Sequence, residues 1–385
     1  MVKDTALYQL PLEKQRDIED VFRHHPKNNL SLPIDSVVRK SLGPYNSLFL
    51  YPGYALVTNF QAVFTGNISF YTDTLSQRKI SSLLLNSLYT ANHQWIELAN
   101  SNIWTAHNHF NLLGDWRFYR FPSYTFGLGS KSDLSKSVKI DYSYVRLYEV
   151  VMTKVAKNID VGMGYNLDEH YNISEHQNDS VSGIYGMDKY GFKTKTVASG
   201  FTANVQYDSR LNANNPQRGI YANVQFRDNL TALGSDNNWT SMVIDWRFYL
   251  PFPKRSGNIL AFWNYDWLTL SGNPPYLDLP SNGWDTYNNT GRGFIEGRFR
   301  GRNMVYSEAE YRFKILRNGL LGGVVFINAS TFSEPTNNQL QQINFGRGLG
   351  LRIKINKKSN TNFVVDYGFG TQGSQGVSFN LNEVF

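Results

Sequence analysis

Residues 303–315 read Asn-Met-Val-Tyr-Ser-Glu-Ala-Glu-Tyr-Arg-Phe-Lys-Ile, and this stretch decides the fold class. Within it, apolar side chains at every second position alternate with charged ones: Ala309, Tyr311, Phe313 and Ile315 against Glu308, Glu310, Arg312 and Lys314. Successive side chains of a β-strand point to opposite faces. The period of two therefore predicts a strand with one apolar face and one charged face.

The same alternation continues almost without interruption from about residue 47 to the end of the chain. A soluble antiparallel sheet also alternates, so the pattern alone does not identify a membrane protein. Here, however, charged residues on several successive strands face away from large aliphatic and aromatic ones. That arrangement is typical of a lipid-facing exterior around a wet, charged lumen, and it predicts an all-β, antiparallel transmembrane β-barrel.

Counting the alternating segments predicts sixteen strands. We place them near residues 47–56, 58–70, 80–90, 94–104, 109–119, 136–150, 155–168, 195–208, 217–229, 238–250, 257–270, 303–315, 319–331, 343–356, 360–370 and 375–385. An even number is what a closed antiparallel barrel needs when both termini lie on one side. Long connections on one side and short ones on the other agree with the outer loops and periplasmic turns of outer-membrane barrels.

The composition excludes several other classes of protein. Of 385 residues, 25 are phenylalanine, 24 tyrosine and 8 tryptophan, and none is cysteine. This apolar content excludes a disordered chain, and the lack of cysteine excludes a disulfide scaffold or a thiolate-bound metal. No apolar run approaches the roughly 18 residues of a membrane helix. The net charge of +7 is scattered without a basic block, so no nucleic-acid partner is expected.

Residues 1–46 form a separate N-terminal segment, and residues 47–385 form the barrel. The segment predicts one short amphipathic helix over residues 12–24, with Ile18, Val21 and Phe22 on one face. Because so short a helix is marginal alone, we expect it to plug the lumen or to dock on the barrel rim. The first residues lack the apolar core of a signal peptide, which we take to have been removed from an exported protein.

The stretch before residue 303 carries a further pattern, Gly-Arg-Gly-Phe-Ile-Glu-Gly-Arg-Phe-Arg-Gly-Arg over residues 291–302. With the following Ala309-Glu-Tyr-Arg-Phe313, it resembles the BamA/TamA-type bacterial surface antigen superfamily of outer-membrane barrels. Two further segments fit this resemblance: residues 208–219, with Asp-Ser-Arg and Pro-Gln-Arg-Gly, and residues 366–370, Asp-Tyr-Gly-Phe-Gly. The resemblance covers about residues 47–385.

The resemblance implies that the loop carrying Arg292, Gly293 and Phe294 folds back into the lumen, where its arginine pairs with residues of the inner wall. A buried guanidinium needs acceptors, and a glycine lets the backbone pass close to the wall. The acidic residues with lumen-facing parity are the candidate partners, namely Glu308, Glu310 and Asp366. Related sequences often have an acid where this chain has Asn328.

The first and last strands should meet at a seam. Residues 48–54 include Pro52, which has no N–H to donate, and Gly53, which weakens a strand. We therefore expect few ladder bonds between this strand and the last one, which begins near Gly376. In BamA-like insertases a weak seam is the lateral gate; the alternative is a proline tolerated at a strand edge beside a turn.

The end of the chain resembles the C-terminal assembly signal of outer-membrane barrels. An aromatic residue, Phe385, follows apolar residues at Val377, Phe379 and Leu381, and all four are expected to share one face.

The resemblance implies a non-enzymatic barrel that assists the insertion or translocation of outer-membrane or secreted proteins. Residues 1–46 have no room for a periplasmic POTRA domain, so we expect a short member whose partner proteins supply such domains. Two alternatives stay open: a pore or lipid-handling barrel, and a structural subunit or homo-oligomer in a larger outer-membrane complex. Outer-membrane lipid and lipopolysaccharide are the expected surroundings. No cofactor, metal ion or catalytic residue is predicted.

Overall fold

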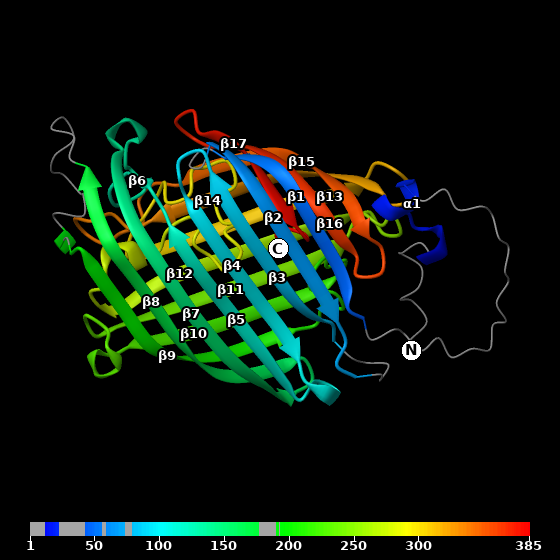
Figure 1. Ribbon diagram of the computed structural model, residues 1–385, viewed down its shortest axis with the longest axis horizontal. Helices are drawn as coiled ribbons and strands as arrows, with labels where there is room; N and C mark the ends of the chain where they lie inside the picture. Colours follow the sequence, from blue (N-terminus) through cyan, green and yellow to red (C-terminus); the bar gives the residue numbers. More distant parts are fainter. Residues whose placement is uncertain (1–11, 23–42, 56–58, 74–78, 177–189, 192) are drawn as a thin grey trace.

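The computed structural model describes residues 12–22, 43–55, 59–73, 79–176, 190–191 and 193–385. In this part of the chain sixteen long antiparallel strands form one nearly closed barrel, which confirms the predicted fold (Figure 1). A seventeenth, very short strand, β6, pairs with β7. The strands are β1 (Tyr45–Ala55), β2 (Asn59–Phe70), β3 (Ser81–Thr90), β4 (Trp95–Trp104), β5 (Phe110–Arg120), β6 (Ser123–Thr125), β7 (Val138–Ala156), β8 (Ile159–His176), β9 (Lys195–Asp208), β10 (Gly219–Asn229), β11 (Trp239–Pro251), β12 (Ile259–Gly272), β13 (Asn303–Lys314), β14 (Leu321–Phe332), β15 (Asn344–Asn356), β16 (Thr361–Phe369) and β17 (Gln375–Leu381).

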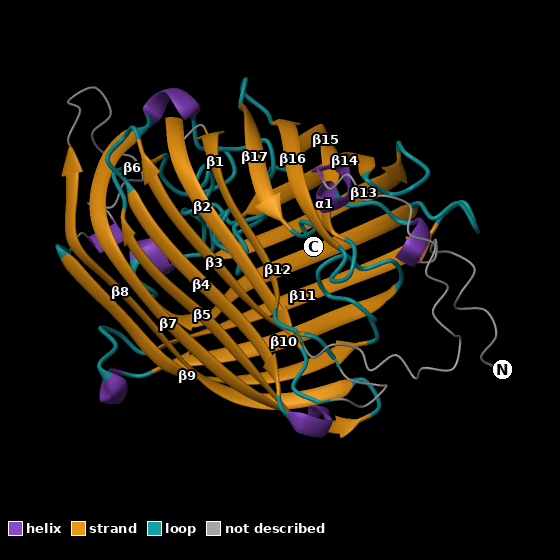
Figure 2. Ribbon diagram, turned by 45° about the vertical axis from the view of Figure 1, so that its right-hand side comes forward, coloured by secondary structure: helices purple, strands orange, loops and turns teal. Residues whose placement is uncertain are grey.

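Helical segments are few and short (Figure 2). The elements that lie within the described residues are one α-helix, α1 (Ile18–Phe22), and five 3-10 turns, η1 (Leu12–Lys14), η2 (Ala106–Asn108), η3 (Leu134–Lys136), η4 (Thr231–Leu233) and η5 (Tyr276–Asp278). Among the described residues, no helix has the length and apolar character needed to cross a bilayer.

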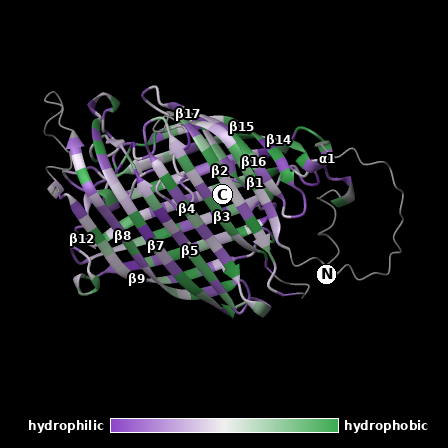
Figure 3. Ribbon diagram, in the orientation of Figure 1, coloured by the Kyte–Doolittle hydropathy of each residue, from purple (hydrophilic) through white to green (hydrophobic). Residues whose placement is uncertain are grey.

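The strand register decides which side chains face the lumen. Glu308 of β13 lies opposite Trp263 of β12 and Asn328 of β14, and all three are buried. The alternate positions face outward; Leu50 and Met163, for example, are 78% and 73% exposed. Figure 3 shows the result as alternating hydrophilic and hydrophobic bands along the strands. The apolar outer face and the polar inner face follow directly from the period of two in the sequence.

The structure corrects the predicted ends of three strands and of the N-terminal helix. Strands β7 and β8 end at Ala156 and His176, beyond the ends predicted at residues 150 and 168. The last strand, β17, ends at Leu381 instead of residue 385, because Asn382 adopts a left-handed φ of 76° and turns the chain. The predicted helix over residues 12–24 is reduced to η1 and the five residues of α1, and residues 23 and 24 lie outside the described part.

Residues 12–22 of the N-terminal segment, which include α1, lie against the turns at one end of the barrel (Figure 1). The Nζ of Lys357, in the turn after β15, donates to Asp20 (2.6 Å), and its backbone N–H donates to Asp17 (3.1 Å). The backbone N–H of Arg16 donates to the carbonyl of Asn318 in the turn between β13 and β14 (3.1 Å). These contacts are with the rim and not with the lumen.

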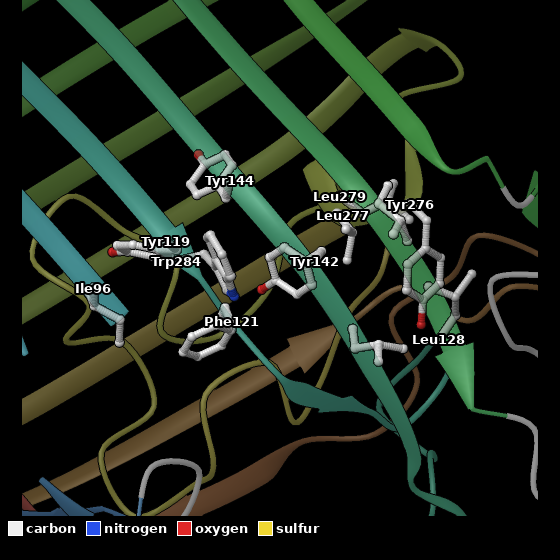
Figure 4. Packing of buried hydrophobic residues seen from close by; sticks show 12 residues of the cluster. Ile96, Tyr119, Phe121, Leu128, Tyr142, Tyr144, Tyr276, Leu277, Leu279 and Trp284 are labelled. Carbon is white, nitrogen blue, oxygen red and sulfur yellow. The ribbon is translucent and has the colours of Figure 1, made fainter. Parts of the chain in front are cut away.

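Buried aromatic side chains fill much of the lumen. One cluster joins the inner wall of β5, β7 and β8 to the long loop 273–302, and Figure 4 shows Trp284 of this loop among Tyr119, Phe121, Tyr142 and Tyr144. The rings of Trp284 and Tyr144 meet edge-on with centroids 5.5 Å apart, a favourable aromatic geometry. The outer loop 273–302, here called loop 6, is thus packed inside the barrel.

Candidate functional site

Arg292, near the tip of loop 6, reaches the inner wall of β13 and β16. Its side chain is 3% exposed and ion-paired with all three predicted carboxylates. Nη1 donates to Asp366 (2.6 Å), and Nη2 donates to Glu310 (2.6 Å) and to Glu308. The guanidinium also lies over the Phe326 ring, 3.8 Å from its centroid. A planar group with five donors suits such a set of acceptors better than a lysine would.

Two further arginines extend this contact into a closed circuit of alternating charges, here called the charge ring. Its members, in order, are Arg292, Glu310, Arg312, Glu383, Arg352 and Asp366. Arg352 is 2.6 Å from Asp366 and 2.7 Å from Glu383, and Arg312 is 3.7 Å from Glu383. Every member is buried or nearly so, which is tolerable only because each charge has opposite charges as neighbours.

Glycines bring the loop close enough for Arg292 to reach the wall. Gly293 has a φ of 97°, and a Cβ on it would lie 2.8 Å from the carbonyl carbon of Phe369. On the facing strand, a Cβ on Gly368 would lie 2.6 Å from the backbone nitrogen of Gly293. Asn328 donates to the Arg292 carbonyl (2.9 Å), so this amide also contacts the loop. The ring of Phe294 packs on Phe299 of the same loop, with centroids 5.4 Å apart.

Sequence reasoning missed two arginines that hold loop 6 to other outer loops and to itself. Arg298 donates to the backbone and side chain of Ser132 (2.6 and 2.7 Å) and to Gln372 (2.6 Å), which lie in the loops before β7 and β17. Arg300 donates to three carbonyls of loop 6 itself, including that of Leu277 (2.9 Å). The sequence shows both arginines but gives no signal of their partners, which are uncharged groups of other outer loops for Arg298 and backbone carbonyls of loop 6 for Arg300.

The residues after β17 enter the lumen, and this corrects a prediction. Val377, Phe379 and Leu381 do alternate on β17, but Phe385 does not share their face. It is 2% exposed inside the barrel, with its ring 5.2 Å from the Trp263 ring, and its carbonyl accepts from Arg312 (2.8 Å). The turn at Asn382 and the ion pairs of Glu383 with Arg312 and Arg352 account for the different position of Phe385. We call residues 382–385 the inner tail.

The seam between β1 and β17 has no backbone ladder among the described residues, where few ladder bonds were expected. β1 pairs with β2 alone, where Pro52 lies opposite Ala62, and β17 pairs with β16 alone, where Gly376 lies opposite Gly368. A Cβ on Gly53 would lie 2.7 Å from the Gln61 amide nitrogen, so this glycine serves the β1–β2 contact.

Aromatic rings bridge the seam in place of hydrogen bonds. The ring of Tyr51, on the inner face of β1, lies 5.1 Å from that of Phe363 and 5.6 Å from that of Phe379. The register places both phenylalanines on the faces of β16 and β17 opposite to the lumenal Asp366 and Ser378. The inner face of β1 therefore overlaps the outer face of these strands.

One buried acid of loop 6 stands outside the charge ring. Burial raises the pKa of Glu296 to about 7. The charges of Arg117 and Arg300 partly offset this shift, and the charge of Asp285 adds to it. Its Oε1 has no hydrogen-bond partner among the described residues. Loop 6 thus contains a group that changes charge near neutral pH.

A nearly closed 16-stranded barrel with an arginine-tipped outer loop in its lumen defines a class of outer-membrane β-barrels. The Omp85 superfamily domain matches residues 81–385, and the chain belongs to this superfamily. This confirms the predicted BamA/TamA-type resemblance. A search of curated proteins finds no match.

Solved structures with the same fold include BamA from Haemophilus ducreyi lacking POTRA domains 1-3, with 15% identity and a TM-score of 0.56. The match covers 88% of this chain and 70% of that one. CdiB from Acinetobacter baumannii (13% identity, TM-score 0.56) matches 88% of this chain and 59% of its own, and CdiB from Escherichia coli (9%, 0.56) matches 87% and 62%. At these identities the likeness shows the fold, and the chain spans about 60% of the CdiB chains.

Proposed function

We propose that this barrel assists the insertion of proteins into the outer membrane, or their translocation across it, through the seam between β1 and β17. The observation that carries the proposal is the absence of a ladder between these strands in an Omp85 barrel. Unpaired N–H and C=O groups at a strand edge are a template for an incoming strand. The fold shared with BamA and CdiB supports the same function.

In this proposal the charge ring braces the wall beside the seam. Arg292 anchors loop 6 to β13 and β16, while Glu383 anchors the inner tail to Arg312 and Arg352. Partner proteins would supply periplasmic domains, and the rim around α1 is the surface closest to them. Val377, Phe379, Leu381 and Phe385 would direct the barrel's own assembly.

The test is a proteoliposome assay that measures the folding rate of a client barrel. The chain has no cysteine, so the pair Tyr51→Cys and Phe379→Cys gives a seam that a short thiol cross-linker can lock. We expect wild-type protein to accelerate insertion, the locked seam to abolish this, and reduction of a cleavable linker to restore it. Acceleration that survives locking would contradict the proposed role of the seam. A lack of acceleration by the wild-type protein, with or without co-purified partners, would contradict the insertase function. Bilayer conductance and lipid scrambling by the same vesicles would instead indicate the pore or lipid-handling alternative.

A further inference from the structure

The inner wall of β2, β3 and β4 differs from the rest of the lumen, because the described residues on it include no ionisable side chain. The register places amides and aliphatic side chains there: Asn67, Asn86, Asn100 and Asn102 with Val63, Leu84, Leu88 and Leu98. We call this surface the amide wall. It lines a cavity of about 520 Å³, whose other sides are formed by β5, β7–β11, loop 6 and β17. That volume lies in the range of roughly 300–1,000 Å³ typical of ligand sites.

Several polar atoms of the amide wall are buried without a partner. Asn100 is 5% exposed, and neither its Oδ1 nor its Nδ2 has a hydrogen-bond partner among the described residues. The same holds for the Nδ2 of Asn67, which is 2% exposed, and for the Oδ1 of Asn102. Buried amides are normally hydrogen-bonded, and leaving them unpaired is unfavourable. All three side chains line the cavity, so their unpaired atoms lie directly beneath its surface.

Most charges that border the cavity are paired with one another, and the unpartnered Oε1 of Glu296 belongs to loop 6, so the free polar groups of the amide wall itself are its amides. Asp115 pairs with Arg117 and Arg146, and Arg247 pairs with Asp245. A charged ligand group placed on the amide wall would lose its hydration without gaining an opposite charge. An uncharged ligand avoids this cost.

Spacing and mixed chemistry favour a polypeptide over a sugar. Asn67 and Asn100 both lie in register with Leu84, one strand to either side of it. At about 4.8 Å between strands they stand roughly 10 Å apart, which three residues of an extended chain span. Each amide matches the donor and acceptor of a peptide group, and the aliphatic neighbours Leu84 and Leu98 accept apolar side chains.

We propose that the amide wall is a binding site for an extended, uncharged polypeptide segment. The cavity is also lined by Tyr51 of β1 and Phe379 of β17, so a segment passing the seam would reach it directly. The inference thereby rests on the proposed function and adds a preference to it: segments of neutral polar and small residues are retained, and charged ones are not.

Fluorescence anisotropy with purified barrel in nanodiscs tests this. The probes are a labelled 12-residue peptide of Gly, Ser, Asn and Thr, the same peptide with Asp for each Asn, and a labelled neutral maltooligosaccharide. We expect the neutral peptide to bind, and the double variant Asn67→Leu with Asn100→Leu to weaken it about tenfold, the effect of losing two hydrogen bonds. The charged peptide should bind about tenfold more weakly or not at all.

Two controls keep the result interpretable. Asn264→Leu makes the same change on the outer face of β12 and should leave binding unchanged, while Asn100→Gln retains an amide and should bind at least as well as the double variant. Heat-modifiable gel mobility shows which variants are folded. Equal binding of both peptides, no loss in the double variant, or variant-sensitive binding of the sugar alone would each overturn the proposal.

The insertion assay separates the two proposals. Peptide binding that depends on Asn67 and Asn100, without client insertion by wild-type protein, would leave the amide wall standing and remove the proposed function. Client insertion that the double variant does not alter, together with no peptide binding, would do the reverse.

Discussion

The lumen has two contrasting walls. On β13, β15 and β16 the inward side chains include charged residues, and the charge ring gives every one of its members a partner within 4 Å. On β2–β4 the inward side chains are mainly amides and aliphatics, and several of the amide groups have no hydrogen-bond partner among the described residues. Mutual pairing makes the first wall a rigid brace for loop 6 and the inner tail. The second wall has amide groups without hydrogen-bond partners, which suits the binding of a ligand.

Breaking the brace should have the largest effect. Arg292→Ala leaves Glu308, Glu310 and Asp366 buried together without their common cation. We expect a loss of about 3–5 kcal/mol in stability, the usual result of removing one partner of a buried ion pair. The measurement is the urea midpoint of the heat-modifiable band, with Arg302→Ala, a half-buried arginine of the same loop outside the charge ring, as control. An unchanged midpoint would show that the brace contributes nothing.

Removing the buried ring of Phe385 in the inner tail should have the next largest effect on stability. Phe385→Ala removes a ring packed on Trp263 and Tyr249 while Glu383 stays in the charge ring. We expect about 3 kcal/mol of destabilisation, the low end of the range for a buried phenylalanine. If the tail belongs to the brace, protease protection of loop 6 falls as well. Protection equal to wild type would separate the tail from the brace.

A smaller, pH-dependent effect should come from Glu296, which belongs to neither wall. Its pKa is about 7 in the folded protein and near 4.5 when exposed, so between these values the folded state alone holds the proton. Stability is then highest below the lower value and decreases as the pH rises to about 7, above which it levels off. Hydrogen exchange of residues 291–297 should therefore quicken from pH 5 to pH 8 beyond its intrinsic rate. Glu296→Gln should remove this excess, and an excess that survives in the variant would point to another group.

The smallest effect on stability is expected for a substitution on the amide wall. Asn100→Leu replaces an unpartnered buried amide by an apolar group of similar size, so stability should change by less than about 1 kcal/mol or increase. The same urea midpoint measures it, with Asn328→Leu as the contrast, because that amide contacts loop 6. Equal losses in the two variants would mean that Asn100 is held by the fold after all.

Prediction from the sequence succeeded where the signal is local. The alternation in residues 303–315 fixed both the strand and its inward carboxylates, and the glycine at 293 marked a close approach. It failed for Arg312, Arg352 and Glu383, whose partnership depends on which strands are neighbours and on where the chain turns. It also misplaced Phe385, because extrapolating the period of two beyond Leu381 ignores the turn at Asn382.

The sequence alone therefore determined the barrel, its strand number and its two faces, since these follow from a repeat of two residues, while the acidic partners of Arg292 came from the family resemblance together with that repeat. Only the tertiary structure decided that the charges close into a ring, that the inner tail enters the lumen, that β1 and β17 do not pair, and that β2–β4 form a wall of amides. These features join residues that are distant in the chain, and their energies come from register and burial, which no local pattern contains.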